Sequence, residues 1–289
     1  MSTTVVRVED RQLKLTNLEK ELYPEYGFTK AEVIDYYRRI APVLLPHLKD
    51  RPVTLRRFPN GVGGESFFEK NVPQHAPEWV RTVRIETPGS SRGNDYADFV
   101  MVDDLPTLVW LANLAALELH IPQWTSGPRG GRRDPDLLVF DLDPGAPATV
   151  VECCRVAQRL RAALEDDGVD AWAKTSGSKG MQLYARAPSK DTSAYAKELA
   201  QRLARETPRE VVSTMAKAAR TGKVLIDWSQ NNPAKTTVAP YSLRARERPS
   251  VSAPITWDEV EECRSPDDLV FLADDVLDRV KTLGDLFGS

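Results

Sequence analysis

The sequence lacks the features that identify membrane proteins and secreted proteins. No apolar run approaches the roughly 20 residues of a membrane-spanning helix, and the N-terminus lacks the apolar core of a secretory signal peptide. The three cysteines include the neighbours Cys153 and Cys154, and no CxxC motif occurs. These absences argue against a disulfide framework and a zinc site. We therefore expect reduced thiols and a cytoplasmic protein with no membrane partner.

The sequence also lacks a strong excess of charge of either sign, because its formal net charge is only −3. The distribution is uneven, since residues 258–285 carry ten acidic and three basic side chains, which leaves +4 on the rest. Patches matter more than totals for phosphate binding, although scattered arginines are usually solvated surface. The basic residues cluster at Arg51, Arg56 and Arg57, at Arg129, Arg132 and Arg133, and at Arg244, Arg246 and Arg248.

What the sequence does have is a pair of carboxylates at the end of an apolar strand. Residues 137–140 are all apolar, Asp141 and Asp143 follow, and Pro-Gly ends the run. Side chains two apart on a strand point to the same face. Two like charges in that position favour a bound divalent cation such as Mg²⁺ or Mn²⁺. The alternative is a turn in which one aspartate caps backbone amides.

A third acid repeats this design. Residues 223–229 form a short apolar strand that ends in Asp227. Two strand-end aspartates with one more acid are the ligand set of two-metal phosphoryl-transfer enzymes, in which one ion activates the attacking oxygen and the other stabilises the leaving group.

A glycine- and serine-rich segment, residues 174–180, lies between the two acidic strands. Small residues let backbone N–H groups approach an anion, and the hydroxyls and Lys179 add donors. The segment is not a Walker loop, because the glycine spacing of that motif is absent. An ordinary turn with an unrelated lysine is the alternative. Together, the order strand, loop and strand indicates a triphosphate held against two metal ions.

Coarser patterns predict the remaining elements. Thr16, with Glu19 three residues later, resembles a helix start, and Thr29 caps a clearer helix. Strands are predicted near 52–58, 80–86 and 96–102, and a basic strand at 240–244. We predict the other helices at 106–119, 147–167, 191–206 and 208–221, with one or two more in the acidic C-terminal segment.

A series of separated segments carries a family pattern: 16–17 with 22–24, 57–61 with 67–70, 117–124, 141–145, 175–180, 227–231 and 235–244. In this order they resemble the polymerase domain of bacterial ligase D, a member of the archaeo-eukaryotic primase superfamily. The resemblance covers roughly residues 10–285. Each segment alone is modest, and their joint order makes the resemblance specific.

The resemblance implies nucleotide addition to DNA ends or gaps in double-strand break repair, with a preference for ribonucleotides. It assigns Asp141, Asp143 and Asp227 to catalysis as ligands of Mn²⁺ or Mg²⁺. It implies nucleotide binding by His120, Ser176, Ser178, Lys179, Gln182, Lys235 and Arg244. The DNA-binding residues that it implies are Lys20 and Lys30, for a 5′-phosphate, with Arg56, Arg57, Phe67 and Phe68.

One position departs from the family pattern. The family reads Ser-Gly-Ser-Lys-Gly-x-His, and here Gln182 replaces the histidine. Glutamine can still form hydrogen bonds but cannot carry a positive charge. The departure leaves room for a weakly active or non-catalytic DNA-end binding module. Acids with basic patches also fit a metal-dependent nuclease, although hydrolysis needs no triphosphate-binding loop.

The expected fold is α/β (α+β), with a primase-like catalytic core whose mixed, largely antiparallel sheet is flanked by helices. We expect residues 1–289 to form one domain: an N-terminal subregion of about 1–105, a core of about 106–257 and an acidic helical segment of about 258–289. The implied partners are DNA with 5′-phosphate ends, gaps or overhangs, nucleoside triphosphates, and end-binding and ligase proteins. A bacterial, nucleoid-associated location follows from these partners.

Overall fold

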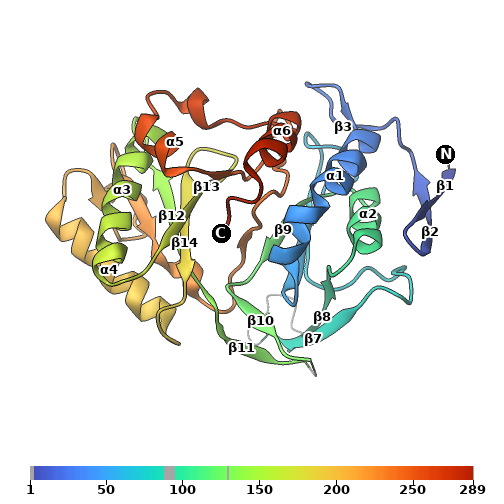
Figure 1. The fold of residues 1–289 in the computed structure, drawn as a ribbon, viewed down its shortest axis with the longest axis horizontal. Helices are drawn as coiled ribbons and strands as arrows, with labels where there is room; N and C mark the ends of the chain where they lie inside the picture. Colours follow the sequence, from blue (N-terminus) through green and yellow to red (C-terminus); the bar gives the residue numbers. More distant parts are fainter. Residues whose placement is uncertain (1–2, 88–94, 129, 289) are drawn as a thin grey trace.

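The computed structural model describes residues 3–87, 95–128 and 130–288, so Arg129 of the predicted basic cluster lies outside the described residues. Two sheets lie side by side, each flanked by helices (Figure 1). The first sheet has the strand order β15-β16-β12-β14-β13-β18. Its strands are β12 (Leu137–Pro144), β13 (Ala171–Thr175), β14 (Met181–Arg186), β15 (Val211–Val212), β16 (Val224–Asp227) and β18 (Pro254–Ile255).

This first sheet is antiparallel except where β15 runs parallel to β16, which confirms the predicted mixed, largely antiparallel sheet. Alternate residues of β12 point to opposite faces. Leu138, Phe140 and Leu142 belong to the core formed with helices α3 (Val150–Asp166) and α4 (Thr192–Glu206). Figure 1 shows both helices on the outer side of the sheet. The aspartates of β12 therefore lie on the opposite face, toward the second sheet.

The second sheet has the order β17-β9-β5-β8-β7, with β6 paired to β5. Its strands are β5 (Pro52–Arg57), β6 (Phe67–Glu69), β7 (Thr82–Glu86), β8 (Tyr96–Met101), β9 (Ala116–Ile121) and β17 (Thr237–Val238). Helix α1 (Lys30–Leu48) begins with the predicted cap, in which Thr29 and Glu32 exchange hydrogen bonds.

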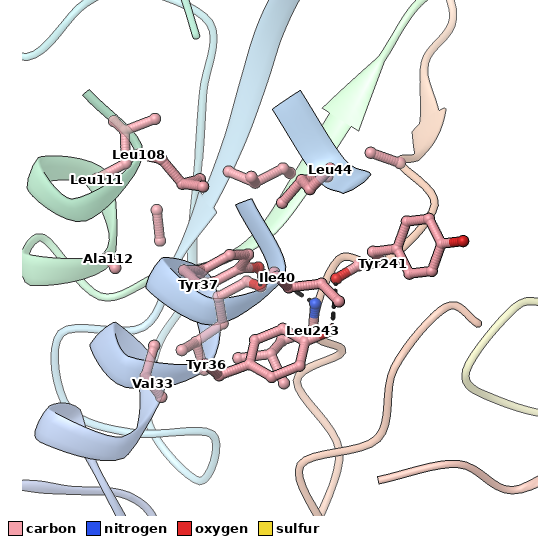
Figure 2. Close-up of a cluster of buried hydrophobic side chains, with 14 of the residues drawn as sticks. Val33, Tyr36, Tyr37, Ile40, Leu44, Leu108, Leu111, Ala112, Tyr241 and Leu243 are labelled. Atoms are coloured by element: carbon pink, nitrogen blue, oxygen red, sulfur yellow. Dashed lines mark hydrogen bonds between the residues drawn. The ribbon is translucent and has the colours of Figure 1, made fainter. Parts of the chain in front are cut away.

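Helix α1 packs between helix α2 (Leu105–Asn113) and the chain segment 239–243 (Figure 2). Val33 and Ile40 contribute apolar side chains to this core. Two buried tyrosines fasten the segment: the Tyr36 hydroxyl donates to the Tyr241 carbonyl (2.8 Å), and the Tyr37 hydroxyl accepts from the Leu243 N–H (3.2 Å). The segment that leads to Arg244 is thereby fixed to helix α1.

The prediction of one helix over 106–119 is wrong. Helix α2 ends at Asn113, and residues 116–121 form β9. A continuous apolar run does not distinguish a buried helix from a buried strand. Here Ala115 adopts a left-handed φ of 57°, which ends the helical path, and β9 pairs with β5. His120 therefore lies on a strand.

Three further predicted elements differ from the structure. The helix start at Thr16 is a turn with Asn17 at φ 53°, because asparagine tolerates the left-handed region. Residues 208–221 form β15 and the 3₁₀ helix η1 (Lys217–Ala219) instead of one helix. The predicted strand 240–244 makes only an isolated bridge, between Leu243 and Val251.

Smaller elements complete the fold. No helix within the described ranges is long and apolar enough to cross a membrane. The C-terminal segment contains α5 (Trp257–Glu262), η3 (Pro266–Leu269) and α6 (Ala273–Leu283), as predicted. The remaining elements are η2 (Trp228–Asn231) and three hairpins: β1 (Thr3–Val8) with β2 (Arg11–Thr16), β3 (Glu21–Tyr23) with β4 (Phe28–Thr29), and β10 (Trp124–Ser126) with β11 (Arg132–Pro135).

Candidate active site

The first sheet brings polar side chains into one row across four strands. Asp141 on β12 pairs in register with Gln182 on β14 and with Asp227 on β16, and Gln182 pairs with Lys174 on β13. Directly paired residues point to the same face of a sheet. Asp143 lies two residues beyond Asp141 and therefore shares that face. The three predicted acids are thus neighbours, although Asp227 is distant from the other two in the chain.

The charge of Asp141 is poorly compensated. Burial, the charge of Asp143 and the charge of Asp227 raise the pKa of Asp141 to about 7, against one hydrogen bond from Gln182 Nε2 to Oδ1 (3.0 Å). Lys174, at the end of the row, is fully buried and donates to Ser252 Oγ (2.6 Å). Burial and the nearby Arg244 hold its pKa well below the usual value. This face of the sheet favours a bound cation.

Asp143 and Asp227 differ in their hydrogen bonding. Burial and the charge of Asp227 raise the pKa of Asp143, and Arg220 opposes them. Asp227 instead caps the helix η2, where its carboxylate accepts from Ser229 N (2.8 Å), Ser229 Oγ (2.5 Å) and Gln230 Nε2 (3.1 Å). The Lys235 ammonium donates to the same Ser229 hydroxyl. The Asp227 carboxylate is therefore already hydrogen-bonded to residues that directly follow its own strand.

A cavity of about 410 Å³ opens in front of Asp141 and Asp143. Eight of the residues predicted for the site line it: His120, Asp141, Asp143, Ser176, Ser178, Lys179, Gln182 and Arg244. Asp227 and Lys235 are not among its lining residues. The lining also includes Gln230 and Arg220, which carried no predicted role. Gln230 follows Asp227 within a motif segment, which was the available signal for it.

The loop between β13 and β14 is built by its small residues. Ser176 Oγ donates to the Gly180 carbonyl (2.9 Å) and accepts from the backbone N–H groups of Ser178 and Gly180 (both 3.3 Å). Gly177 has a φ of +63°, and a Cβ there would lie 2.4 Å from Arg244 Cγ. Glycine at this position therefore lets the loop pack directly on the arginine that shares the cavity.

The wall opposite the carboxylates is basic. Arg244 and His120 line it, on the segment after residue 239 and on β9. Arg244 has a largely buried side chain, and its Nε has no hydrogen-bond partner within the described residues. Burial lowers the pKa of Arg244 from its usual value, with Glu118 opposing the change. Arg244 Nε lies 3.4 Å from Glu118 Oε1, and a largely buried guanidinium that lines the cavity suits an anionic ligand.

The predicted DNA-binding residues lie outside this cavity and form two groups. In the first, Lys20 donates to Asn60 Oδ1 (3.1 Å), and the buried Lys30 donates to the Thr16 carbonyl (2.6 Å). Burial, then the charges of Lys20 and Arg57, lower the pKa of Lys30 to about 8. Three cations thus lie close together, although Arg57 is bound to Glu69 (2.9 Å). Such a cluster suits a phosphate.

The second group is the aromatic pair on β6. Phe67 and Phe68 are 47% and 46% exposed, which is unusual for phenylalanine. The Phe68 ring meets the His120 ring edge to face, with centroids 5.2 Å apart. Arg56 pairs in register with Phe68 and lies over the Phe58 ring (5.0 Å). An exposed aromatic surface therefore adjoins the basic wall of the cavity.

The carboxylates fit a divalent cation that is completed by its ligand. In the part of the chain that the structure describes, no three His, Cys, Asp or Glu side chains are placed to enclose a metal ion by themselves. Mg²⁺ in phosphoryl-transfer sites commonly takes one or two carboxylates, with substrate phosphates and water as its other ligands. Asp141 and Asp143 match that donor set. Asp227 would have to exchange hydrogen bonds with η2 to join them.

Comparison with known proteins decides the family. A sequence model of the LigD primase-polymerase domain matches residues 29–287. The chain belongs to the LigD primase-polymerase domain family. The multifunctional non-homologous end joining protein LigD of Mycolicibacterium smegmatis is 43% identical over 279 residues, which are 95% of this chain and 35% of that protein. The bifunctional LigD of Bacillus subtilis is 32% identical, over 94% of this chain and 43% of that protein.

A solved structure agrees with this family. The polymerase domain of Mycobacterium tuberculosis ligase D, in complex with DNA, has a TM-score of 0.89 and 40% identity, covering 96% of this chain and 97% of that chain. This LigD-type domain therefore spans less than half of the full-length relatives and nearly all of the solved domain. The comparisons confirm the predicted family, fold and enzyme class, which is a nucleotidyltransferase of the primase-polymerase type. The roles of individual side chains remain predictions.

Proposed function

We propose that this domain adds nucleotides to DNA ends and gaps during non-homologous end joining, with a preference for ribonucleotides. The observation that carries the proposal is the mixed lining of the cavity. Asp141 and Asp143 line it together with the Ser-Gly loop, Lys179 and Arg244. A nucleoside triphosphate with its cation has the matching charges, because the cation faces the acids and the phosphates face the basic wall.

In this proposal Asp141, Asp143 and Asp227 hold Mn²⁺ or Mg²⁺. The cations supply neutralisation of the phosphate charge and activation of the attacking oxygen when bound. Lys179, the serine hydroxyls of 176 and 178, and Arg244 hold the triphosphate, and His120, Gln182 and Lys235 complete the nucleotide site. A primer 3′-hydroxyl attacks the α-phosphate, and pyrophosphate leaves. Orientation of the triphosphate is the contribution of the protein side chains.

The DNA is proposed to lie over the two groups outside the cavity. Lys20 and Lys30, with Arg57, bind a 5′-phosphate, since clustered cations suit a terminal dianion. Phe67 and Phe68 stack on unpaired bases without sequence preference, and Arg56 contacts the backbone. The solved relative is a complex with DNA, which supports this partner. End-binding and ligase proteins, and a nucleoid location, belong to the same proposal.

We further propose that residues 1–289 act as one primase-polymerase domain, with subregions at about 1–105, 106–257 and 258–289. Pairing of β5 with β9 supports a single unit, because these strands come from two of the subregions. The acidic C-terminal segment packs on both cores through Phe271.

An extension assay tests the function. The protein is mixed with a 5′-phosphorylated gapped duplex, Mn²⁺ or Mg²⁺, and labelled ribonucleotides or deoxyribonucleotides. We expect primer extension that is faster with ribonucleotides, and Asp141→Ala should abolish it while leaving DNA affinity nearly unchanged. Shortening of the DNA would instead support a nuclease, and binding without extension would support a non-catalytic end-binding module. Extension by Asp141→Ala would overturn the assignment of the site.

A further inference from the structure

Glu118 is a buried carboxylate that the proposed reaction does not use. It lies on β9, is only 1% exposed and shares a face of that strand with His120. A buried charge is costly unless it is paired and hydrogen-bonded. The groups that pair with Glu118 therefore explain how a charged carboxylate can be buried at this position on the second sheet.

Both oxygens of Glu118 are occupied by groups that belong to the basic wall. Oε2 accepts from His120 Nε2 (2.9 Å) and lies 3.5 Å from an Arg56 nitrogen. Oε1 accepts from the backbone N–H of Ala245 (3.0 Å) and lies 3.4 Å from Arg244 Nε. Burial alone would raise the pKa of Glu118, but His120, Arg244 and Ala245 lower it to about 2. Glu118 is therefore an anion with three cationic or polar side chains around it.

This contact determines which nitrogen of His120 carries its proton. An ionised carboxylate can only accept, so Nε2 must be the donor, and Nδ1 is the nitrogen left for a ligand. Burial lowers the pKa of His120, with Arg244 and Arg56 acting in the same direction and Glu118 opposing them. Burial therefore disfavours the imidazolium form of His120, and the contact with Glu118 fixes the tautomer of the neutral ring.

The same carboxylate fixes Arg244 twice. It attracts the guanidinium directly, and it anchors the next residue of the chain through the Ala245 N–H. On the preceding side, the Tyr23 hydroxyl donates to the Arg244 carbonyl (3.0 Å). The arginine is thereby held at its backbone and its side chain.

We propose that Glu118 is a positioning residue of the nucleotide site: its carboxylate holds the Arg244 guanidinium in the orientation that receives the triphosphate, and it holds the His120 imidazole with Nδ1 free to accept a hydrogen bond from a donor group of the nucleotide. The inference rests on the proposed function and deepens it, because it assigns the preorganisation of the basic wall to one buried acid. Glu118 itself touches neither the substrate nor the cation. Its loss should weaken nucleotide binding while leaving the DNA contacts at Lys20 and Lys30 unchanged.

The first test compares Glu118→Gln with the wild-type protein in single-nucleotide extension. Glutamine keeps the shape and removes the charge, so we expect KM for the nucleotide to rise by about tenfold, with a smaller change in kcat. Affinity for 5′-phosphorylated DNA should stay within twofold. Glu259→Gln is the matched control, because Glu259 accepts from Arg279 Nη2 (2.8 Å) in the C-terminal segment and does not line the cavity. This control should leave KM unchanged. A wild-type KM in a folded Glu118→Gln protein would overturn the proposal.

The second test measures the wild-type protein directly and uses a variant only to assign the signal. The chain has only three histidines, so imidazole ¹⁵N spectra resolve each of them, and His120→Gln assigns the signal. We expect the Nε2–H tautomer for His120 in the nucleotide-free protein, and a bare Nε2 would overturn the proposal. This spectrum is independent of catalysis. A wild-type protein with the expected tautomer and no extension would therefore reject the proposed function and not the Glu118 contact.

Discussion

The two sheets place carboxylates in opposite electrostatic surroundings: Asp141 lines the cavity, and Glu118 lies behind His120 and Arg244, which line it. On the first sheet, Asp141 has two acids as neighbours, and burial with their charges raises its pKa to about 7. On the second sheet, Glu118 is only 1% exposed, yet His120 and Arg244 outweigh the burial and lower its pKa to about 2. Neighbouring charges, and not depth alone, separate the two groups.

The difference indicates what each carboxylate does. A group that is costly to ionise in the free protein gains most from a cation that arrives with a ligand. A group that is already compensated gains nothing from a further cation, and its removal leaves its partners unpaired. The carboxylates of the first sheet thus favour a bound cation. On the second sheet, the compensated carboxylate holds basic side chains in position for the anionic triphosphate.

The largest expected effect comes from Asp141→Asn, which should show the difference between the two sheets most clearly. Extension should fall at least about a hundredfold, because a metal ligand supplies several kcal/mol in such sites. Stability in chelator should nevertheless rise: removing one of three neighbouring like charges contributes about 1 kcal/mol, so Tm increases by about 2 °C. Added Mn²⁺ should raise Tm of the wild-type protein and have little effect on the variant. Thermal scans with and without Mn²⁺ measure this.

Glu118→Gln is the counterpart on the second sheet. It should lower Tm and keep the Mn²⁺-induced increase. Because the pKa of Glu118 falls from 4.5 to about 2, its contribution to stability is present above pH 4.5 and is lost as pH falls toward 2. The two proteins should therefore converge in stability across that window. If Mn²⁺ raised the Tm of Asp141→Asn as much as it raises the Tm of the wild-type protein, the proposed contrast between the two sheets would be wrong.

A smaller effect is expected for a buried cation, the ammonium group of Lys30. The pKa of Lys30 is lowered to about 8, first by burial and then by Lys20 and Arg57. The ammonium is charged below that pH and neutral above it, so affinity for a 5′-phosphate should fall by roughly three- to tenfold between pH 7 and pH 9. Lys30→Arg should remove most of this slope, since arginine stays charged. Fluorescence anisotropy with 5′-phosphorylated and 5′-hydroxyl duplexes measures it, and equal slopes for both would contradict the phosphate contact.

The first sheet was largely predictable from local patterns. Alternation along 137–143 places Asp141 and Asp143 on one face, and the Pro-Gly sequence ends the strand. The pairing of Asp227 with Asp141 is a long-range register that no local pattern contains. Nor does the strand pattern reveal that Asp227 caps η2, because Ser229 and Gln230 lie beyond the strand.

The second sheet was much less predictable. The apolar run before His120 continues that of α2, so periodicity favours one helix where the structure has a helix and a strand. Within that predicted helix, Glu118 looks like an ordinary acidic residue. Its partner Ala245 is 127 residues away in the sequence, and only the packed fold brings them together. Compensation of a buried charge is a tertiary property.

The smallest expected effect concerns Gln182, the position at which this chain departs from the family pattern. Gln182 Nε2 donates to Asp141 Oδ1 (3.0 Å), so it touches the acidic wall at the centre of the row. Histidine can carry a charge and form a charge-assisted hydrogen bond that is about twice as strong. We expect Gln182→His to raise turnover about fivefold. Gln182→Leu, which removes the hydrogen bond, should lower it. Equal rates for the wild-type protein and Gln182→His would mean that the row needs a donor here and no positive charge, which would leave charge compensation of the triphosphate to Lys179 and Arg244.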